Sequence, residues 1–284
     1  MNIKIFGHVC IDRNISENST FTGRGSPAVF IKKMFNQLPD CNVEIIASYG
    51  NDSVRYLDGI NIYPKSPNAE KTLIYENISF KGLRSQKAFN RMEALPVPID
   101  KWIENGTKVA DIIFFAPILP NYPAEYYAKV ASLCKHGALK VLLPQGYFRD
   151  FDSSDNVIIR DFNEGKEILS FIDIVIASEQ DHPDMIHLAQ GWVKNNNLIS
   201  LITRGEKGAL ALTKHGKINL PAREVKIGDI VDSVGSGDIF SAGFAYRYKQ
   251  TRDIKEAGRF ANELARQCLF YPPDKMKIDL TKLI

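Results

Sequence analysis

Short runs of apolar, mostly branched side chains recur along this chain of 284 residues, separated by longer stretches with helical spacing. The apolar residues in each run are nearly continuous rather than alternating with polar ones, which is typical of strands buried on both faces of a parallel sheet. The stretches between them predict helices on both sides of that sheet, joined by right-handed β-α-β connections. The predicted strands are Ile3–Val9, Val43–Ser48, Ile112–Ala116, Lys140–Leu143, Ile172–Ala177 and Leu198–Thr203, and the predicted helices are Pro27–Asn36, Pro123–Cys134, Asn163–Ser170 and Met185–Lys194.

Two regions depart from this rhythm. Between about residues 60 and 92, apolar and polar residues partly alternate, which predicts a sheet with one face in water. Residues 208–220 predict a β-hairpin, with the turn at Lys214-His215-Gly216-Lys217. No repeat or Pro/Gly-rich linker interrupts the chain, so we expect residues 1–284 to form a single domain.

Composition excludes several classes of protein. The net charge is +3, and no dense Lys/Arg run is present, which argues against a nucleic-acid-binding protein. The four cysteines, Cys10, Cys41, Cys134 and Cys268, lie far apart without a C-x-x-C pair, which argues against a zinc site or a disulfide scaffold. The N-terminus lacks a signal-peptide pattern, and no stretch approaches the roughly 20 apolar residues of a membrane span. We therefore expect a cytoplasmic protein with reduced thiols, bound to neither nucleic acid nor membrane.

The segment Asp232-Ser233-Val234-Gly235-Ser236-Gly237-Asp238 carries the clearest chemical signal. Its glycines precede a helical stretch, so they lie where a loop turns into a helix. Unpaired N–H groups and the dipole at a helix start form an anion site suited to phosphate, and glycines allow close approach. A carboxylate beside such a site can accept the proton of a hydroxyl that attacks a phosphoryl group. On spacing alone, a capped helix with an acidic first turn explains the segment equally well.

Matching motifs elsewhere decide between these interpretations. The segment resembles the D-T-x-G-A-G-D signature of the ribokinase-like (PfkB) carbohydrate kinase family, and other family motifs follow in the right order. The resemblance covers nearly the whole chain. The further matches are Gly7-His8-Val9-Cys10-Ile11-Asp12 (G-x-x-x-x-D), Arg24-Gly25-Ser26-Pro27-Ala28-Val29 (G-G-S-P-x-N), Thr203-Arg204-Gly205-Glu206-Lys207-Gly208 (T-x-G-x-x-G) and Pro144-Gln145-Gly146-Tyr147-Phe148-Arg149 (P-Q-G-x-x-R).

The resemblance implies a three-layer α/β/α fold with a mostly parallel central sheet and a small β-sheet lid, whose strands would lie within about 12–24 and 60–92. It also implies an ATP- and Mg²⁺-dependent phosphotransferase acting on a hydroxyl of a sugar, cyclitol or nucleoside. The lid strands would be the surface of a homodimer. The roles that it implies are catalytic base for Asp238; anion hole for Gly235, Ser236 and Gly237; acceptor binding for Asp12, Arg24, Gly25, Arg84 and Arg149; nucleotide binding for Thr203, Gly205, Gly208 and Asn262; and magnesium binding through water for Asp181.

Three positions depart from the family pattern. Arg24 replaces the first glycine of the G-G pair, Val29 replaces the usual asparagine, and Ser178 replaces the asparagine of the N-x-x-E motif, which reads Ser178-Glu179-Gln180-Asp181 here. These departures concern the acceptor more than the reaction, because Asp238 and the glycines beside it are present.

Two other functions remain open from the sequence. A catalytically weak sugar- or nucleotide-binding regulator on the same fold would account for the departures. An NAD-dependent enzyme would need G-x-G-x-x-G after the first strand, where Gly7 stands alone. Several proposed site residues also have ordinary explanations as turn or surface residues, namely Asp12, Arg84, Arg149, Gly205, Gly208 and Asn262.

Overall fold

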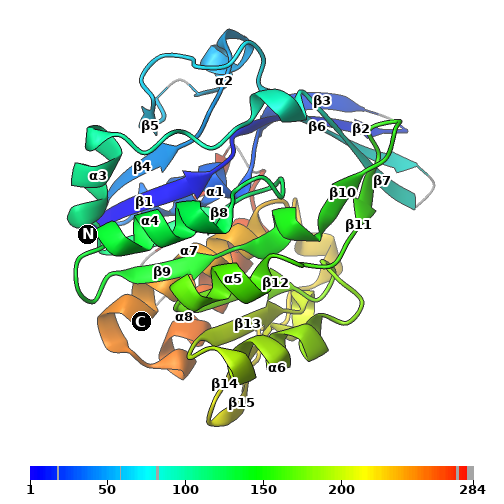
Figure 1. The fold of residues 1–284 in the computed structure, drawn as a ribbon. Helices are drawn as coiled ribbons and strands as arrows, with labels where there is room; N and C mark the ends of the chain where they lie inside the picture. The colour runs from blue at the N-terminus through cyan, green and yellow to red at the C-terminus, as the bar shows by residue number, and fades with distance from the viewer. Residues whose placement is uncertain (18, 58, 81–82, 273–274, 280–284) are drawn as a thin grey trace.

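The computed structural model describes residues 1–17, 19–57, 59–80, 83–272 and 275–279, with only the backbone described at 83 and 84. Within these residues a large sheet has the strand order β15-β14-β13-β12-β9-β8-β1-β4-β5 (Figure 1). From β13 to β5 all neighbouring strands are parallel, and β14 and β15 extend one side as an antiparallel hairpin. The strands are β1 (Asn2–Gly7), β4 (Asn42–Ile46), β5 (Ile62–Tyr63), β8 (Ile112–Ala116), β9 (Leu139–Leu142), β12 (Ile174–Ser178), β13 (Ile199–Thr203), β14 (Ala209–Thr213) and β15 (Gly216–Leu220).

The mostly parallel sheet predicted from the apolar runs is confirmed. Strand β8 has the predicted bounds, and all of its side chains are buried. The other predicted strands form with small shifts at their ends, and the predicted hairpin forms as β14 and β15. Burial on both faces explains why near-continuous apolar runs were the right signal.

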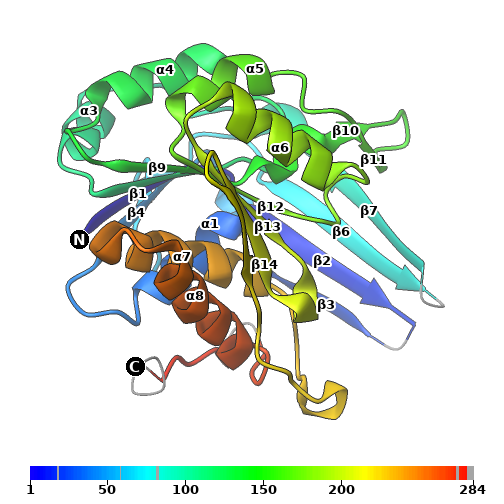
Figure 2. The same cartoon turned by 90° about the horizontal axis from the view of Figure 1, so that it is seen from below.

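Helices cover both faces of the large sheet, which gives three layers (Figure 2). Side chains of successive strand residues point to opposite faces of the sheet. Ile5 packs in the hydrophobic core on one face, and Phe6 packs in the core on the other face. One layer contains α1 (Pro27–Phe35), α7 (Ser236–Thr251) and α8 (Ile254–Cys268); the other contains α3 (Lys101–Lys108), α4 (Ala124–Leu133), α5 (Gly165–Ile168) and α6 (Met185–Asn195). A short helix, α2 (Val54–Leu57), lies in the connection between β4 and β5.

The helices follow local rules. Helix α8 begins where the Asp253 carboxylate accepts hydrogen bonds from the N–H groups of Lys255 and Glu256. Its buried residues recur on one stripe, from Ala257 through Ala261 and Leu264. Helix α1 is buried almost all around because it lies between the sheet and α7.

A second, four-stranded sheet has the order β3-β2-β6-β7 and projects from one end of the large sheet (Figure 1). Pairs β2–β3 and β6–β7 are antiparallel, while β2 and β6 are parallel. The sequence placed such strands within about 12–24 and 60–92. The stretch from 60 to 72 differs, because buried Ile62 belongs to β5 and pairs with β4 in the large sheet. The strands are β2 (Cys10–Ser16), β3 (Thr20–Gly25), β6 (Leu73–Phe80) and β7 (Leu83–Phe89), with the hairpin β10 (Arg149–Phe151) and β11 (Val157–Ile159) nearby.

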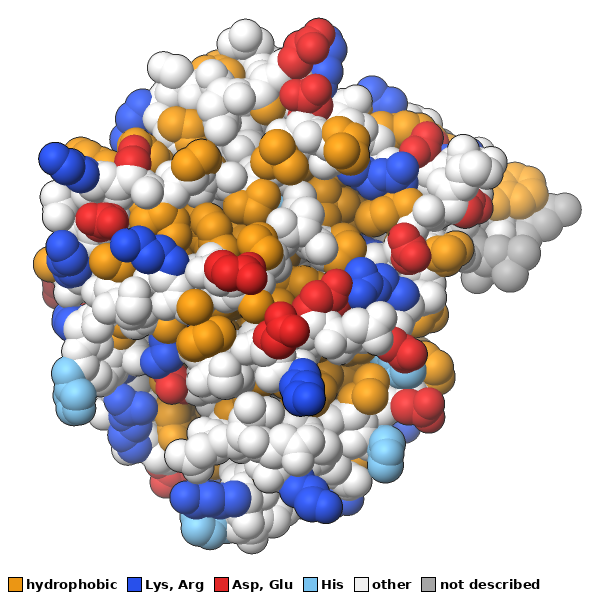
Figure 3. Space-filling model, viewed as in Figure 1, with side chains coloured by type: hydrophobic (Ala, Val, Ile, Leu, Met, Phe, Trp, Pro, Cys, Tyr) orange, Lys and Arg blue, Asp and Glu red, His pale blue; other side chains and the backbone are white. Residues whose placement is uncertain are grey.

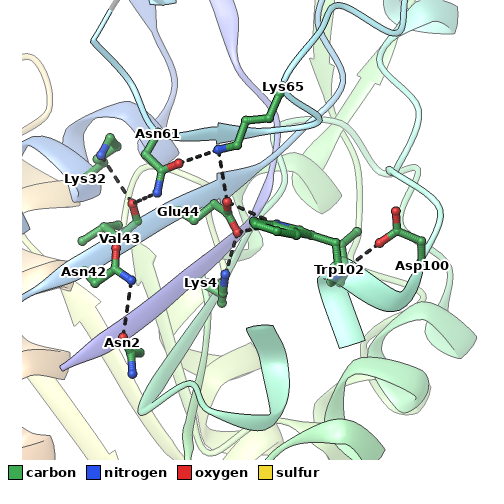
Figure 4. A network of polar contacts seen from close by, with 11 residues as sticks. Asn2, Lys4, Lys32, Asn42, Val43, Glu44, Asn61, Lys65, Asp100 and Trp102 are labelled. Atoms are coloured by element: carbon green, nitrogen blue, oxygen red, sulfur yellow. Dashed lines mark hydrogen bonds and ion pairs between the residues drawn. The ribbon is translucent and has the colours of Figure 1, made fainter. Parts of the chain in front are cut away.

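The buried carboxylate of Glu44 on β4 links β1, the segment after β5 and helix α3 (Figure 4). Glu44 Oε2 lies 2.5 Å from Lys4 Nζ, and Glu44 Oε1 lies 3.3 Å from Lys65 Nζ. The indole Nε1–H of Trp102, on α3, donates to the same carboxylate at 3.3 Å. We call Glu44, Lys4, Lys65 and Trp102 the Glu44 cluster; its buried acid is fully supplied with donors.

Charges of both signs are mixed among the described residues on the face shown in Figure 3, which carries hydrophobic side chains across its middle. This mixing agrees with the small net charge. None of the helices in the described part of the chain has the length and hydropathy needed to cross a bilayer.

Candidate active site

The predicted site residues gather where the parallel strands end and the second sheet begins. Asp12 lies on β2, soon after β1 ends, and Arg149 follows β9 through the turn Pro144–Phe148. Asp181 follows β12, and Asp238 lies on α7. Carboxyl ends of parallel strands are the usual location of binding sites in open α/β sheets.

Helix α7 begins with an open backbone. Gly235 has φ of 80°, and a Cβ there would lie 2.5 Å from the Phe30 ring, so only glycine fits. Gly237 is exposed, with no heavy atom within 4 Å of the position where its Cβ would be. The first N–H groups of a helix lack intrahelical acceptors. The N–H of Ser236 donates to the Ser233 carbonyl oxygen at 3.2 Å, so Gly237 and Asp238 are the residues that present donors toward this open space. The Asp232 carboxylate accepts from the N–H of Val234 at 2.8 Å and so orders the preceding turn.

Asp238 is half-buried in the first turn of α7. Burial, followed by the charges of Asp181 and Asp12, raises the pKa of Asp238 to about 7, and the positive charge of Arg149 partly opposes this. A carboxyl group with a pKa near neutrality is suited to accept a proton during catalysis. Asp181, Asp12 and Arg149 are therefore close enough to Asp238 for their charges to influence its pKa.

Asp12 is the second acid of this space. Burial raises the pKa of Asp12 to about 6, while the Cys10 thiol, which donates to Asp12 Oδ1 at 3.3 Å, and the charge of Arg149 lower it. Gly25 faces Asp12 across the strand pair, and a Cβ at Gly25 would lie 2.1 Å from the carboxylate. Glycine at this position therefore leaves Asp12 the room it occupies.

Arg149 supplies positive charge among these acids. Its guanidinium carbon lies 4.8 Å from the centroid of the Tyr75 ring. Tyr75 is itself held by donating its hydroxyl to the carbonyl oxygen of Ile118 at 2.5 Å. Tyr75 therefore fixes the position of the arginine between the acids.

Asp181 is the third acid. Its Oδ2 accepts from the N–H of Ser178 at 2.8 Å, and the Gln145 side chain also hydrogen-bonds to it. Burial raises the pKa of Asp181, with Arg149 and these hydrogen bonds opposing. Ser178 thus contributes its backbone, which the asparagine of the family motif could also have done.

This donor set fits Mg²⁺ better than a structural metal. Among the described residues, no group of three or more His, Cys, Asp and Glu side chains could hold a metal ion. Mg²⁺ in phosphoryl-transfer enzymes takes one or two carboxylates together with waters and substrate phosphates. Asp181 matches that requirement, because its carboxylate has hydrogen-bond donors but no directly paired cation among the described residues.

The residues predicted to bind nucleotide lie beside the end of β13. Gly205 and Gly208 both have left-handed backbones, with φ of 55° and 81°. A Cβ at Gly208 would lie 2.2 Å from the Leu220 carbonyl oxygen. Asn262 is buried and donates its amide to the carbonyl oxygens of Leu220 and Pro221 at 3.0 and 3.2 Å, so its amide holds the end of β15, which packs against Gly208. The Thr203 hydroxyl is 3.4 Å from the Ala177 carbonyl oxygen.

Two other positions, Arg24 and Val29, do not lie with the three acids, and the position of the Arg84 side chain is not described. Arg24 is exposed on β3 opposite Ile11, whereas Asp12 lies opposite Gly23, so Arg24 and Asp12 belong to opposite faces of the strand pair. Val29 is buried in the main core. Arg84 lies on β7 opposite Ser79, and its side chain is outside the described residues.

Sequence reasoning missed the residues that support the acids. Cys10, Tyr75 and Gln145 contact Asp12, Arg149 and Asp181, respectively. Gln145 belongs to the same P-Q-G-x-x-R motif as Arg149, and this closeness in sequence could have identified it as a site residue. Tyr75 had none, because its contact with Arg149 joins residues far apart in the chain.

Comparison with known proteins agrees with this arrangement. The family model described as pfkB family carbohydrate kinase matches residues 107–273. This chain belongs to the pfkB family of carbohydrate kinases. It is accordingly a phosphotransferase that acts on an alcohol group of a sugar or nucleoside.

Full-length relatives extend the match beyond the family model. This pfkB-family chain is 24% identical to a cytidine kinase of Thermococcus kodakarensis, over 95% of its own length and 96% of the relative. A pyrophosphate-dependent kinase in the ribokinase family superimposes with a TM-score of 0.77 at 14% identity, covering 96% of each chain. The nucleoside kinase of Burkholderia thailandensis, solved with inosine, superimposes with a TM-score of 0.71 at 13% identity, covering 100% of this chain and 95% of that one. These structures confirm the ribokinase-like fold.

Proposed function

We propose that this enzyme transfers the γ-phosphoryl group of ATP to a hydroxyl of the pentose of a nucleoside. The observation that carries the proposal is Asp238, whose pKa is raised to about 7 at the open start of α7. A pentose hydroxyl that lies between Asp12 and Asp238 would be both oriented and deprotonated. The likeness to a cytidine kinase along the whole chain favours a nucleoside over a free sugar or a cyclitol.

In the reaction, the acceptor oxygen forms a bond to the γ-phosphorus as the bond from that phosphorus to the bridging oxygen of ADP breaks. Asp238 takes the hydroxyl proton. The N–H group of Gly237, at the open start of α7, and the Arg149 guanidinium stabilise the charge on the transferred group. Asp12 accepts hydrogen bonds from the acceptor's other hydroxyls and thereby positions it.

The donor side of the site would be formed by the loop between Thr203 and Gly208, where both glycines have positive φ. Asn262 on α8 supports the neighbouring end of β15 through the carbonyl oxygens of Leu220 and Pro221. Mg²⁺ bound with the nucleotide would neutralise phosphate charge, and Asp181 is the residue that would hold it through water. Asp181 has one carboxylate oxygen engaged by Ser178. Its other oxygen is hydrogen-bonded at most by Gln145.

The domain organisation is part of this proposal. Residues 1–284 would act as one kinase domain in which the second sheet closes over the acceptor and excludes water. The contact between Tyr75 on β6 and Arg149 supports such closure, because it joins the second sheet to the site acids.

A coupled assay of ADP release tests the proposal, with cytidine, inosine, ribose and myo-inositol as acceptors and ATP as donor. We expect the highest kcat/KM with a nucleoside. A preference for myo-inositol or ribose would overturn the nucleoside assignment. A parallel assay with pyrophosphate as donor tests ATP itself, since one structural neighbour is pyrophosphate-dependent.

One observation favours the second candidate, a weakly catalytic ligand-binding regulator. Val29 occupies the family's asparagine position and is buried in the core, so it offers the acceptor no polar contact. Cytidine binding detected by calorimetry, without turnover of any acceptor, would favour the regulator.

A further inference from the structure

A cavity of about 540 Å³ opens at the edge of the large sheet opposite to the candidate active site. It lies at the beginnings of β9, β12 and β13, whereas the site residues follow the ends of these strands. The turn between α7 and α8 and the turn between β14 and β15 complete its walls. We call it the amino-edge cavity; its volume is in the range of small-molecule sites.

The floor of the amino-edge cavity is apolar. Leu139, Ile174 and Ile199 line it from three neighbouring strands, and Ile254 lines it from the start of α8. The ring of Tyr248, near the end of α7, is partly exposed beside them. Such a floor favours a ligand with an apolar, ring-containing body.

The rim carries positive charge that none of the described acids neutralises by an ion pair. Arg252 and Lys214 are exposed lining residues, and neither forms an ion pair with any described residue. The acid at the rim, Asp173, is already paired with Lys140 at 2.8 Å. The surplus of charge therefore favours an anion.

Arg252 also occupies a backbone position where glycine is usual. It follows the last turn of α7 with φ of 58°, a left-handed conformation that is unfavourable for a residue with a side chain. Its guanidinium carbon lies 5.6 Å from the centroid of the Tyr248 ring. The arginine side chain is thus held over the aromatic wall of the cavity.

We propose that the amino-edge cavity is a second, non-catalytic binding site for a small organic anion, one that carries a phosphate or carboxylate group on an apolar ring. The ring would lie on the floor against Tyr248, and the anionic group would contact Arg252 and Lys214. Such a ligand would bind the end of the sheet away from the transferred phosphoryl group. The inference stands independently of the acceptor and donor proposed above.

Ligand-observed NMR titration of the whole chain with phenyl phosphate tests the site, with benzoate as the carboxylate counterpart. Benzyl alcohol lacks the charge and inorganic phosphate lacks the ring, so both should bind at least about tenfold more weakly, the effect of losing one favourable contact of roughly 1.4 kcal/mol. Inorganic phosphate or benzyl alcohol binding as tightly as both aromatic anions would overturn the proposal.

Two variants locate the binding. Arg252→Gly removes the guanidinium and suits the left-handed backbone, and Lys214→Glu reverses the other rim charge. Each should weaken phenyl phosphate binding about tenfold or more. Lys217→Glu, an exposed change on the same hairpin outside the cavity, is the matched control and should bind like the wild type. Unchanged affinity in both rim variants, or no binding by the wild type, would overturn the assignment.

Discussion

The two groups of buried acids in this molecule are stabilised in opposite ways. In the Glu44 cluster, one carboxylate receives two lysines and an indole N–H. In the active site, Asp12, Asp181 and Asp238, here called the site carboxylates, share the single guanidinium of Arg149. The first arrangement stabilises the fold. The second leaves three acids with one shared cation, and burial raises the pKa of each acid, as the proton acceptance and Mg²⁺ binding of the proposed function require.

The largest effect is expected on turnover. Asp238→Asn removes the proton acceptor, and kcat should fall by about 100-fold or more. ATP affinity, measured by calorimetry, should be retained because the N–H groups of α7 remain. Asp229→Asn, an exposed change in the loop before α7, is the control and should leave kcat unchanged. A near-wild-type rate in Asp238→Asn would contradict the assigned role.

In the Glu44 cluster, we expect a substitution to lower stability and to leave turnover nearly unchanged. Glu44→Gln leaves Lys4 and Lys65 without their counter-charge and should lower the free energy of unfolding by about 3 kcal/mol. Urea denaturation measures this, and kcat corrected for the folded fraction should stay close to that of the wild type. The exposed Glu167→Gln should change stability by less than about 0.5 kcal/mol. Equal stabilities of the two variants would remove the contrast between the two groups of acids.

The third prediction concerns the position of the Asp12 carboxylate, which has no cation of its own. In Gly25→Ala the new Cβ would occupy the position of the Asp12 carboxylate and displace it. We expect KM for the acceptor to rise about tenfold, the scale for one lost polar contact, with little change in KM for ATP. Gly191→Ala on α6, where the added Cβ meets no atom within 4 Å, should leave both constants unchanged. A rise in both KM values would point to general distortion.

The smallest effect is a pH dependence of stability. A carboxyl group with a raised pKa in the folded state contributes stability below its unfolded pKa near 4, and this is lost as pH rises through its folded pKa, about 7 for Asp238. A rise of about three pKa units corresponds to about 4 kcal/mol without solvent screening. Because water reaches the half-buried Asp238, wild-type stability should fall relative to Asp238→Asn between pH 4 and pH 8 by a smaller amount, on the order of 1–2 kcal/mol. Urea midpoints across this range measure the difference. Parallel curves for the two proteins would show that Asp238 titrates normally.

Local patterns predicted much of the scaffold and the reactive segment. The apolar run Ile112–Ala116 became strand β8, and the glycines before Asp238 became the open start of α7. Both features are set by residues close together in sequence. The spacing of apolar residues indicates which side chains are buried, and glycine allows the backbone turn at which this helix begins. The family resemblance added the pairing of Asp12 with Asp238 across most of the chain.

The tertiary structure alone decided how charge is compensated. Tyr75 beneath Arg149, the two lysines on Glu44, and Arg252 over Tyr248 at the amino-edge cavity are contacts that a local pattern does not specify. A sequence reveals which residues carry charge, but pKa values and ion pairs depend on distances between atoms that only the packed chain sets. The sequence by itself thus determined the fold class and predicted Asp238 as the proton acceptor, and the packing determined which acids receive a counter-charge.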